Sequence, residues 1–179
     1  MLFHETQVAG SYVVEAERMK DERGFFARTF SSGEFAARGL DHRVEQCSTS
    51  FNAKYGTLRG LHYQASPYGE AKLVRCTRGA IYDVAVDLRP DSPSYLRWVG
   101  LELSADNGRA LFVPEGCAHG FQTLVDATEV LYQISTPYEP AAARGVRWDD
   151  PAFNIDWPPA PPGGRTIAAR DARYPDFAP

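Results

Sequence analysis

The chain has 179 residues and a formal net charge of −4, and 44% of its residues are hydrophobic. Because single domains most often have about 100–200 residues, we expect one domain over residues 1–179, with a core that needs no metal or disulfide. The acidic balance argues against a general nucleic-acid-binding protein, which normally carries a basic stripe.

Short apolar runs separated by turn residues dominate the sequence. One short helix is expected at 31–40, where Ser31 or Ser32 is placed to cap its start. Many short strands joined by tight turns predict an all-β sandwich or barrel, and the double-sheet jelly roll is a common form. The expected strands cover residues 10–16, 73–76, 80–88, 98–103, 110–113, 121–124 and 129–135.

The C-terminal part differs in composition from the rest of the chain. Residues 157–165 read WPPAPPGGR, and this Pro/Gly-rich stretch predicts an irregular loop. The residues after it, 166–179, either form a tail or fold back on the body.

Cysteine usage and hydropathy indicate the compartment. Cys47, Cys76 and Cys117 stand at unrelated spacings, which form neither a disulfide framework nor a zinc motif. Such cysteines are typical of free thiols in a reducing compartment. No apolar stretch approaches the ~20 residues of a membrane span, and the N-terminus lacks the pattern of a signal peptide. We therefore expect a cytoplasmic protein without a membrane partner.

The first segment with chemical potential is GTLRGLHYQ, residues 56–64, which contains Arg59 and His62. In a strand, alternation places His62 and Gln64 together on one face. Taken alone, such a segment is more often a strand with a solvated arginine and a structural histidine. If the polar face is directed into the interior of a sandwich, it indicates a site instead.

The second segment is FVPEGCAHGF, residues 112–121, where a PxGxxH turn precedes an apolar strand. This pattern is typical of the second motif of cupin jelly rolls. Metal-binding cupins add an HxH pair and a glutamate from the first motif. Here His62 is followed by Gln64 instead of a second histidine, and Glu70 is the nearest acid downstream. This weak ligand set does not predict a metal.

Two residues outside these motifs each have two interpretations. Tyr132 lies in an expected strand and is either a core aromatic, which composition alone favours, or a phenol directed into a cavity. Lys72 precedes an apolar strand. It is either solvated or faces the cavity, where its positive charge would lie against a substrate oxyanion.

Taken together, the segments resemble the nucleotide-sugar 3,5-epimerase family, typified by the dTDP-4-dehydrorhamnose 3,5-epimerases. The resemblance implies a cupin-like jelly roll that forms a homodimer and works without a metal or an organic cofactor. It covers most of the chain, in order, through DERGFFARTF (21–30), GTLRGLHYQ (56–64), KLVRCTRGAIYDVAVDLRPDSP (72–93), LFVPEGCAHGFQTL (111–124), EVLYQ (129–133) and RGVRWDDPAFNIDWP (144–158).

The resemblance also implies roles for individual residues. The family's catalytic base maps to His62, its acid to Tyr132, and the carboxylate that orients the base to Asp171. Lys72 and His119 map to the residues that hold the enolate and the sugar. Arginines that grip the diphosphate map to Arg23, which comes across the dimer interface in relatives, and to Arg59. The other implied substrate-binding residues are Arg28, Gln46, Gln64, Tyr138 and Arg170.

The chemistry of such a reaction accounts for these residue types. Carbons beside a ketone are weakly acidic, and their deprotonation leaves an enolate that needs electrostatic stabilisation. Histidine suits this proton transfer near neutral pH, and a carboxylate behind it fixes its tautomer. Guanidinium groups bind phosphate oxygens in pairs. Because the ketone is already part of the substrate, no redox cofactor is needed.

Departures from the family pattern leave the substrate open. Arg28 and Ala143 stand where relatives usually have glutamate, and Arg170 stands where they have lysine. The leading prediction is inversion of C3 and C5 of a dTDP-linked 4-keto-6-deoxyhexose. A mono-epimerase, or an enzyme for a CDP- or GDP-linked sugar, is the first alternative. A metal-dependent cupin enzyme and a non-catalytic sugar-nucleotide-binding protein are alternatives of other classes.

Overall fold

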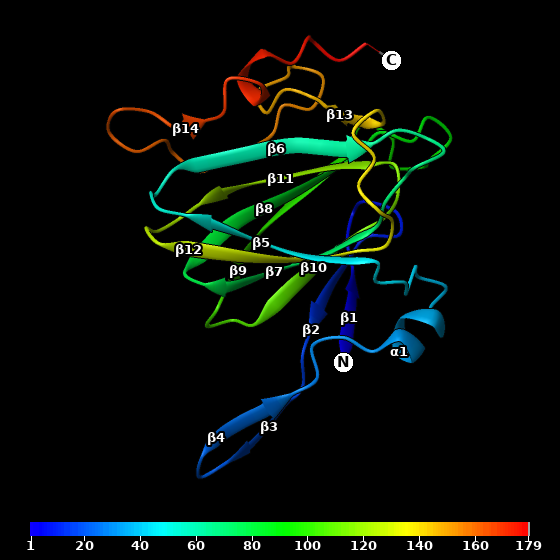
Figure 1. Cartoon of the computed structure of the whole chain (residues 1–179), viewed down its shortest axis with the longest axis vertical. Helices are drawn as coiled ribbons and strands as arrows, with labels where there is room; N and C mark the ends of the chain where they lie inside the picture. Colours follow the sequence, from blue (N-terminus) through cyan, green and yellow to red (C-terminus); the bar gives the residue numbers. More distant parts are fainter. Residues whose placement is uncertain (179) are drawn as a thin grey trace.

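The computed structural model describes residues 1–178, which form two facing β-sheets with little helix (Figure 1). The first sheet has the antiparallel strand order β1-β2-β10-β7-β12-β5. Its strands are β1 (Leu2–Glu5), β2 (Tyr12–Glu15), β10 (Arg109–Val113), β7 (Lys72–Arg78), β12 (Thr128–Ile134) and β5 (Gln46–Asn52). The expected all-β, cupin-like jelly roll is confirmed.

The second sheet has the order β13-β6-β11-β8-β9, and a short strand, β14, pairs in parallel with β6. A separate hairpin and two short helices complete the fold. The strands of the second sheet are β13 (Ala143–Gly145), β6 (Thr57–Gln64), β11 (Cys117–Thr123), β8 (Ala80–Asp87), β9 (Trp98–Ser104) and β14 (Thr166–Ile167). The remaining elements are β3 (Arg18–Asp21), β4 (Gly24–Ala27), α1 (Ser32–Ala36) and the 3-10 helix η1 (Asp171–Arg173).

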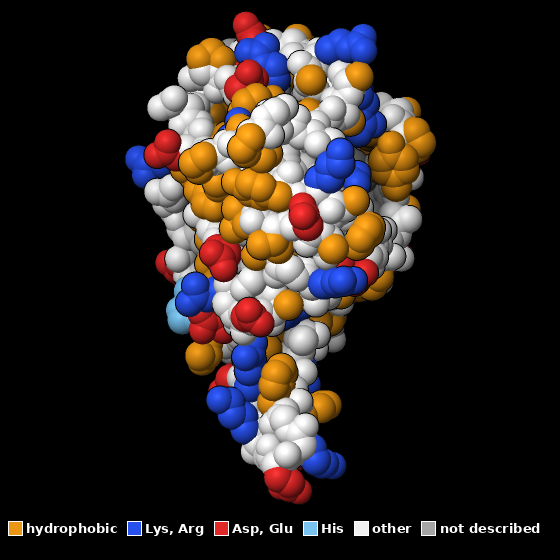
Figure 2. Space-filling model, turned by 90° about the vertical axis from the view of Figure 1, so that its left-hand side faces the viewer, with side chains coloured by type: hydrophobic (Ala, Val, Ile, Leu, Met, Phe, Trp, Pro, Cys, Tyr) orange, Lys and Arg blue, Asp and Glu red, His pale blue; other side chains and the backbone are white. Residues whose placement is uncertain are grey.

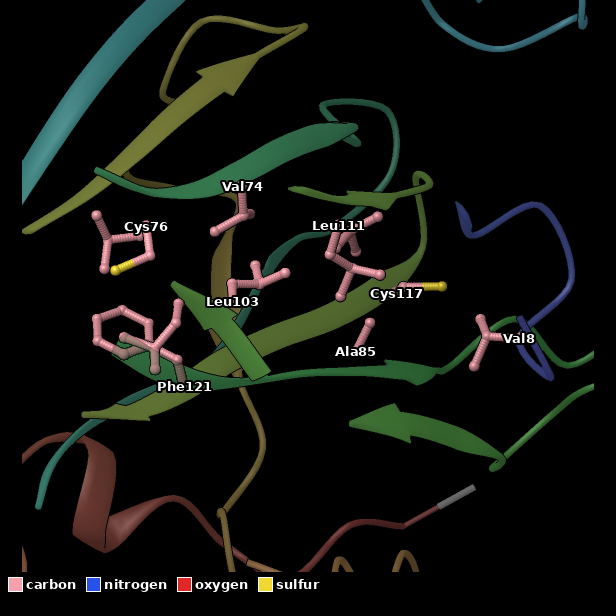
Figure 3. Packing of buried hydrophobic residues seen from close by; sticks show 11 residues of the cluster. Val8, Val74, Cys76, Ala85, Leu103, Leu111, Cys117 and Phe121 are labelled. Carbon is pink, nitrogen blue, oxygen red and sulfur yellow. The ribbon is translucent and has the colours of Figure 1, made fainter. Parts of the chain in front are cut away.

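The main core lies between the two sheets and is built by strand alternation. Along β7, Val74 and Cys76 belong to this core, whereas Leu73 packs on the outer face of the sheet. Figure 3 shows Val74 and Leu111 from the first sheet close to Phe121 and other residues of the second. One side of each inner strand therefore makes the core, as the period of two requires.

Both outer faces of the sandwich are also covered. On the first sheet, Phe35 of α1 packs with Val14, Leu73 and Phe112. On the second sheet, Leu61, Val84, Val86 and Ala118 pack against Phe153 and other apolar residues of the C-terminal segment. The second sheet therefore needs the C-terminal segment as its cover.

The C-terminal segment folds back on the body. The stretch from Trp157 to Arg165 is irregular, as expected. After it, β14 pairs with the start of β6, and Asp171 at the beginning of η1 is buried. Residues 166–179 were expected either to form a tail or to fold back on the body. Residues 166–178 fold back, and Pro179 lies outside the described residues.

The expected strands all exist, with boundaries that differ by a few residues. The largest difference is in β11, which begins at Cys117, whereas the expected strand began at residue 121. The expected helix at 31–40 is shorter, since α1 covers only Ser32–Ala36. Ser31 occupies the N-cap position, but its side chain makes no capping hydrogen bond with the described backbone. Strands β1, β3, β4, β5, β13 and β14 were not expected, because they are short or lie at sheet edges where polar residues are tolerated.

A buried carboxylate holds the loop that follows β8. Asp87 is fully buried and accepts hydrogen bonds from the Arg89 side chain (Nε to Oδ1, 2.8 Å) and from the hydroxyls of Ser92 and Ser94. Burial alone would raise the pKa of Asp87, but these hydrogen bonds outweigh it and lower the pKa to about 2.

Replacing Asp87 with Asn should therefore reduce stability near neutral pH by about 2 kcal/mol, because the folded protein holds the ionised form more tightly than the unfolded chain. Since the pKa is depressed on folding, this contribution is complete above pH ~4 and disappears as the pH falls towards 2. Urea unfolding of both proteins across this range measures it. Equal stability of the two proteins at pH 7 would contradict the assignment.

Candidate active site

A cavity of about 680 Å³ lies between the two sheets, and charged and polar side chains line it together with apolar ones. Its walls come from strands of both sheets, so residues far apart in the sequence face the same space. The first sheet supplies Gln46, Ser48, Ser50, Lys72, Tyr132 and Ile134. The second supplies Arg59, His62, Tyr63, Gln64, His119, Gly120, Phe121, Ala143 and Arg144, and loops supply Glu70, Tyr138, Pro140, Arg170 and Tyr174.

His62 and Asp171 form a hydrogen-bonded pair at one wall. The Nε2 atom of His62 lies 2.9 Å from Oδ1 of Asp171, and the histidine side chain is one-third exposed while the aspartate is buried. The backbone amide of Gly60 donates to the other carboxylate oxygen at 3.1 Å. Asp171 is therefore held by β6 itself, the strand that carries His62.

The charge state of Asp171 follows from these contacts. Burial alone would raise its pKa, but the hydrogen bond and charge of His62, with the Gly60 amide and Arg170, lower the pKa below its usual value. The group is thus an anion at neutral pH. An anionic carboxylate on one nitrogen fixes the imidazole orientation and favours its protonated form after proton uptake.

Strict alternation does not hold along β6. Arg59 and His62 both border the cavity, although strict alternation places residues three apart on opposite faces; Tyr63 also reaches its border but packs with Leu61 on the outer face, as alternation expects. The pairing with β11 shifts register between His119 and Phe121, which allows this departure.

Gly60 marks the point where β6 and β11 approach most closely within the site. A Cβ at Gly60 would lie 2.6 Å from the His119 carbonyl oxygen and 2.7 Å from the Gly120 Cα. Its φ of +109° is also outside the range that other residues adopt without strain. Only glycine therefore allows His62 and His119 to stand on adjacent strands of one wall.

His119 has its own buried carboxylate. Its Nε2 lies 2.8 Å from Oδ1 of Asp83, and both side chains are almost fully buried. Burial raises the pKa of Asp83, although His119 and Lys72 act in the opposite direction. The Oδ2 atom of Asp83 has no hydrogen-bond partner among the described residues. The His119 ring meets the Tyr132 ring edge-on, with centroids 6.1 Å apart.

Tyr132 stands on β12, in the wall opposite His62. Its hydroxyl is 3.3 Å from Oγ of Ser50 on the neighbouring strand β5. Burial raises the pKa of Tyr132, and Ser50 offsets this only in part. The phenol is therefore protonated at neutral pH, and Tyr132 both lines the cavity and packs against the main core.

Lys72 also faces the cavity and not the solvent. Its Nζ lies 2.8 Å from Oε1 of Glu70 and 3.3 Å from the backbone carbonyl of His62. Within the described chain, Glu70 is the only carboxylate that lines the cavity, against the permanent cations of Arg59, Lys72, Arg144 and Arg170. The lining therefore favours an anionic ligand.

Arg59 is held in place before any ligand binds. Its Nε donates to Oδ1 of Asn52 at 2.7 Å, across the gap between β6 and β5. This contact fixes one edge of the guanidinium and leaves the other edge directed to the cavity, which it lines. A fixed guanidinium fork suits the paired oxygens of a phosphate.

Two of the residues expected to bind substrate also hold loops. The Gln64 amide donates to the carbonyls of Tyr68 and Pro137 and accepts from the Glu139 amide, so its polar atoms are used by the protein itself. The Gln46 side chain accepts from the backbone amide of Tyr138 at 2.8 Å. The loop segment around Tyr138, which borders the cavity, is thus held by both glutamine side chains.

Arg23 and Arg28 do not border this cavity. Arg23 lies in the turn between β3 and β4, where its guanidinium pairs with Asp21 and 82% of its side chain is exposed. Arg28 follows β4 and is exposed. Figure 1 shows this hairpin projecting away from the body of the molecule. The other expected site residues are gathered at the cavity, with Asp171 directly behind His62.

The sequence did not indicate several residues of the site. Ser48, Ser50 and Arg144 line the cavity from edge strands that were not expected. Tyr174 packs so closely on Gly145 that a Cβ there would overlap its ring, and it meets the His62 ring edge-on. For Asp83 the sequence did contain a signal. Asp83 lies between Ile81 and Ala85 on the inward face of β8, and a carboxylate at such a position requires a polar partner nearby.

Residues 1–178 contain neither a group of side chains that could hold a metal ion nor a membrane-spanning helix. No three His, Cys, Asp or Glu side chains of this part are grouped so that they hold a metal ion. No helix of the same range is long and apolar enough to cross a membrane.

Comparison with known proteins gives a consistent result. The sequence model of a family described as dTDP-4-dehydrorhamnose 3,5-epimerase matches residues 5–179. The enzyme of that name from Sinorhizobium fredii is 44% identical over 158 residues, which are 88% of this chain and 81% of the relative.

Solved structures of the same family superpose closely. The dTDP-4-dehydrorhamnose 3,5-epimerase from Elizabethkingia anophelis has a TM-score of 0.94 at 34% identity, covering 99% of this chain and 96% of its own. The enzyme from Bacillus anthracis, solved with TDP and PPi bound, has a TM-score of 0.92 at 39% identity, with coverage of 98% and 99%.

Replacing Gly60 with Ala should cost about 3–5 kcal/mol of stability, because the methyl group meets backbone atoms of β11 and the φ is strained. Urea unfolding measures the loss. Gly163→Ala is the matched control, since Gly163 also has a positive φ (+94°) but open space around it, and about 1–2 kcal/mol is expected there. Similar losses in the two variants would show that the approach of β6 to β11 is not tight.

Proposed function

The chain belongs to the dTDP-4-dehydrorhamnose 3,5-epimerase family, a family of isomerases, and we propose that it inverts C3 and C5 of a dTDP-linked 4-keto-6-deoxyhexose. The observation that supports this most directly is the pair of proton-transfer groups on opposite walls of one cavity, His62 on β6 and Tyr132 on β12. An inversion requires proton removal on one face of the sugar and proton delivery on the other.

His62 acts as the base. It takes the proton from the carbon beside the ketone, and the electron pair of the C–H bond moves into the enolate. Asp171 holds the ring by one nitrogen and, as an anion, stabilises the imidazolium that forms. The one-third exposure of the His62 side chain leaves the ring accessible to a ligand in the cavity.

The enolate needs a positive environment around its oxygen. Lys72 and His119 face the cavity next to His62 and supply N–H donors for this charge. Such donors, fixed before the reaction, stabilise developing charge more than mobile water does.

Tyr132 then returns a proton to carbon from the opposite wall. Its phenol is protonated because burial raises its pKa, and Ser50 is within hydrogen-bonding distance of its oxygen. Uptake of the proton on the face opposite to His62 inverts the centre. His62 then releases its proton to solvent and the Tyr132 phenolate takes one up from solvent, which restores both groups and closes the cycle.

The diphosphate of the substrate matches the cationic lining of the cavity. Arg59, already fixed by Asn52, and Arg170 at the mouth near His62 are placed to bind its oxygens. The bound TDP and PPi in the Bacillus anthracis relative support the thymidine nucleotide as the ligand.

We further propose a homodimer in which Arg23 serves the site of the partner. The β3–β4 hairpin projects from the body and exposes Met19, Phe25 and Phe26, the last at 66% (Figure 2). Exposed large apolar side chains at the end of a projecting hairpin indicate a surface that a partner covers. Strand β5 is the open edge of the first sheet and lines the cavity, so a partner hairpin at this edge would bring Arg23 to the cavity mouth.

Isotope exchange tests the reaction. In deuterated water with dTDP-4-keto-6-deoxyglucose, we expect deuterium at both C3 and C5 of the sugar. His62→Ala should lower the exchange rate about 10²–10⁴-fold because the base is lost. Tyr132→Phe should still exchange protons through His62 but should not invert the centres. Mass spectrometry measures exchange, and NMR measures inversion.

His4→Ala is the matched control, because His4 is exposed on β1 outside the cavity, and its activity should equal that of the unmodified protein. No deuterium at either carbon with the unmodified protein would reject the reaction for this sugar. Deuterium at a single carbon would indicate a mono-epimerase, and exchange with CDP- or GDP-linked sugars alone would change the nucleotide.

A mixed dimer tests the role of Arg23. Arg23→Ala and His62→Ala should each be weakly active as homodimers. In a mixed dimer of the two variants, one site combines an intact His62 with an intact Arg23 from the partner. Its activity should recover to about half per dimer. If Arg23 served the site of its own chain, each site of the mixed dimer would keep a defect and no recovery would be seen.

A further inference from the structure

The unexplained group in the cavity is the carboxylate of Glu70. An acid within a cationic lining repels an anionic ligand, so its presence there requires a reason. Glu70 lies in the loop before β7, two residues before Lys72, and only 10% of its side chain is exposed. Glu70 forms an ion pair with Lys72.

The contacts of Lys72 show what Glu70 does. The lysine side chain has four methylene groups and a freely turning ammonium, which alone does not define a position. Here the ammonium has two acceptors, Oε1 of Glu70 at 2.8 Å and the carbonyl oxygen of His62 at 3.3 Å. Two of its three N–H bonds are therefore directed at the protein, and the third is left for the cavity that Lys72 lines.

The second acceptor links this arrangement to the base. Because it is the backbone carbonyl of His62, the ammonium is held at a fixed place relative to the residue that removes the proton. The main-chain acceptor cannot be exchanged by mutation of a side chain, whereas Glu70 is a single, replaceable anchor. The carboxylate also compensates the cost of burying the ammonium, which is 9% exposed.

We infer that Glu70 is a positioning residue that fixes the Lys72 ammonium beside His62, where its free N–H bond meets the enolate oxygen. The inference rests on the proposed function, since it assigns Lys72 the enolate as its ligand. Glu70 itself does not touch the substrate. Its effect on the reaction passes through Lys72 alone.

A split between kcat and KM is the first expected consequence. The charge on the ketone oxygen develops only during proton removal, so loss of the anchor should affect the transition state more than substrate binding. For Glu70→Gln we expect kcat to fall about 10–100-fold while KM changes less than about threefold. Glu115→Gln is the matched control, since Glu115 is exposed next to the same loop and does not line the cavity, and it should leave both constants unchanged.

A double-mutant cycle separates positioning from a direct role. Lys72→Met removes the ammonium but keeps the side-chain length, and kcat should fall about 10³-fold. If Glu70 acts through Lys72, the double variant K72M/E70Q should have the same kcat as K72M. A further loss of kcat in the double variant, equal to that of E70Q in the unmodified protein, would overturn the inference, because Glu70 would then act without Lys72.

Two more outcomes would overturn it. A raised KM with unchanged kcat in E70Q would show that Glu70 contacts the substrate, and unchanged constants would show that it has no part in the reaction. Glu70→Asp covers the case in which E70Q does not fold. It keeps the charge but is shorter by one methylene group, so kcat should fall about 3–10-fold with KM retained, and an unmodified kcat would count against the inference.

Failure of the inference and failure of the proposed function are distinguishable. Deuterium exchange by the unmodified protein decides whether the sugar nucleotide is a substrate. Only when exchange occurs do the Glu70 variants have a rate to change. Exchange in the unmodified protein with equal rates in E70Q therefore removes the role of Glu70 and leaves the proposed function in place.

Discussion

The site depends on one hydrogen bond, between His62 on β6 and Asp171 at the start of the 3-10 helix η1. This contact joins residues 109 positions apart and has two consequences. It fixes the imidazole, and it fastens the C-terminal segment over the second sheet, where apolar residues of that segment cover Leu61, Val84 and Val86. The orientation of the His62 ring therefore depends on the folding of the C-terminal segment over the second sheet.

A second constraint is that the space between the two sheets holds both the apolar core and the cavity. Towards one part of the space between the sheets, inward positions carry Val74, Cys76, Ile81 and Phe121, which form the core. Towards the other part, inward positions carry polar groups that a core would exclude, among them Asp83. Each of these groups needs a partner to offset its desolvation. The paired His62–Asp171, His119–Asp83 and Lys72–Glu70 contacts supply such partners, so the contacts that offset burial also orient these groups.

The chemistry of the site was accessible from residue types and motifs. The histidine of the RGLHYQ segment, the tyrosine on a strand and the lysine before an apolar run each had a structural interpretation as well as a functional one. Sequence order could not choose between them, because the choice depends on which face of a strand meets the cavity. The register shift between β6 and β11 shows the limit, since it brings Arg59 and His62, three residues apart, to the same cavity against simple alternation.

The sequence by itself determined the all-β class and most strands, because turn residues and alternation are local properties of the chain. For proton transfer it offered candidates, His62, Tyr132 and Asp171, through the family resemblance. Tertiary structure alone decided that the C-terminal segment folds back, that Gln64 holds loops, and that Glu70 pairs with Lys72 inside the cavity. It also placed Arg23 outside the cavity of its own chain. These outcomes arise from packing between distant segments, and for such contacts no local pattern exists. His62 has a side chain suited to act as a base, but the ring is oriented only because Asp171 reaches it across the fold.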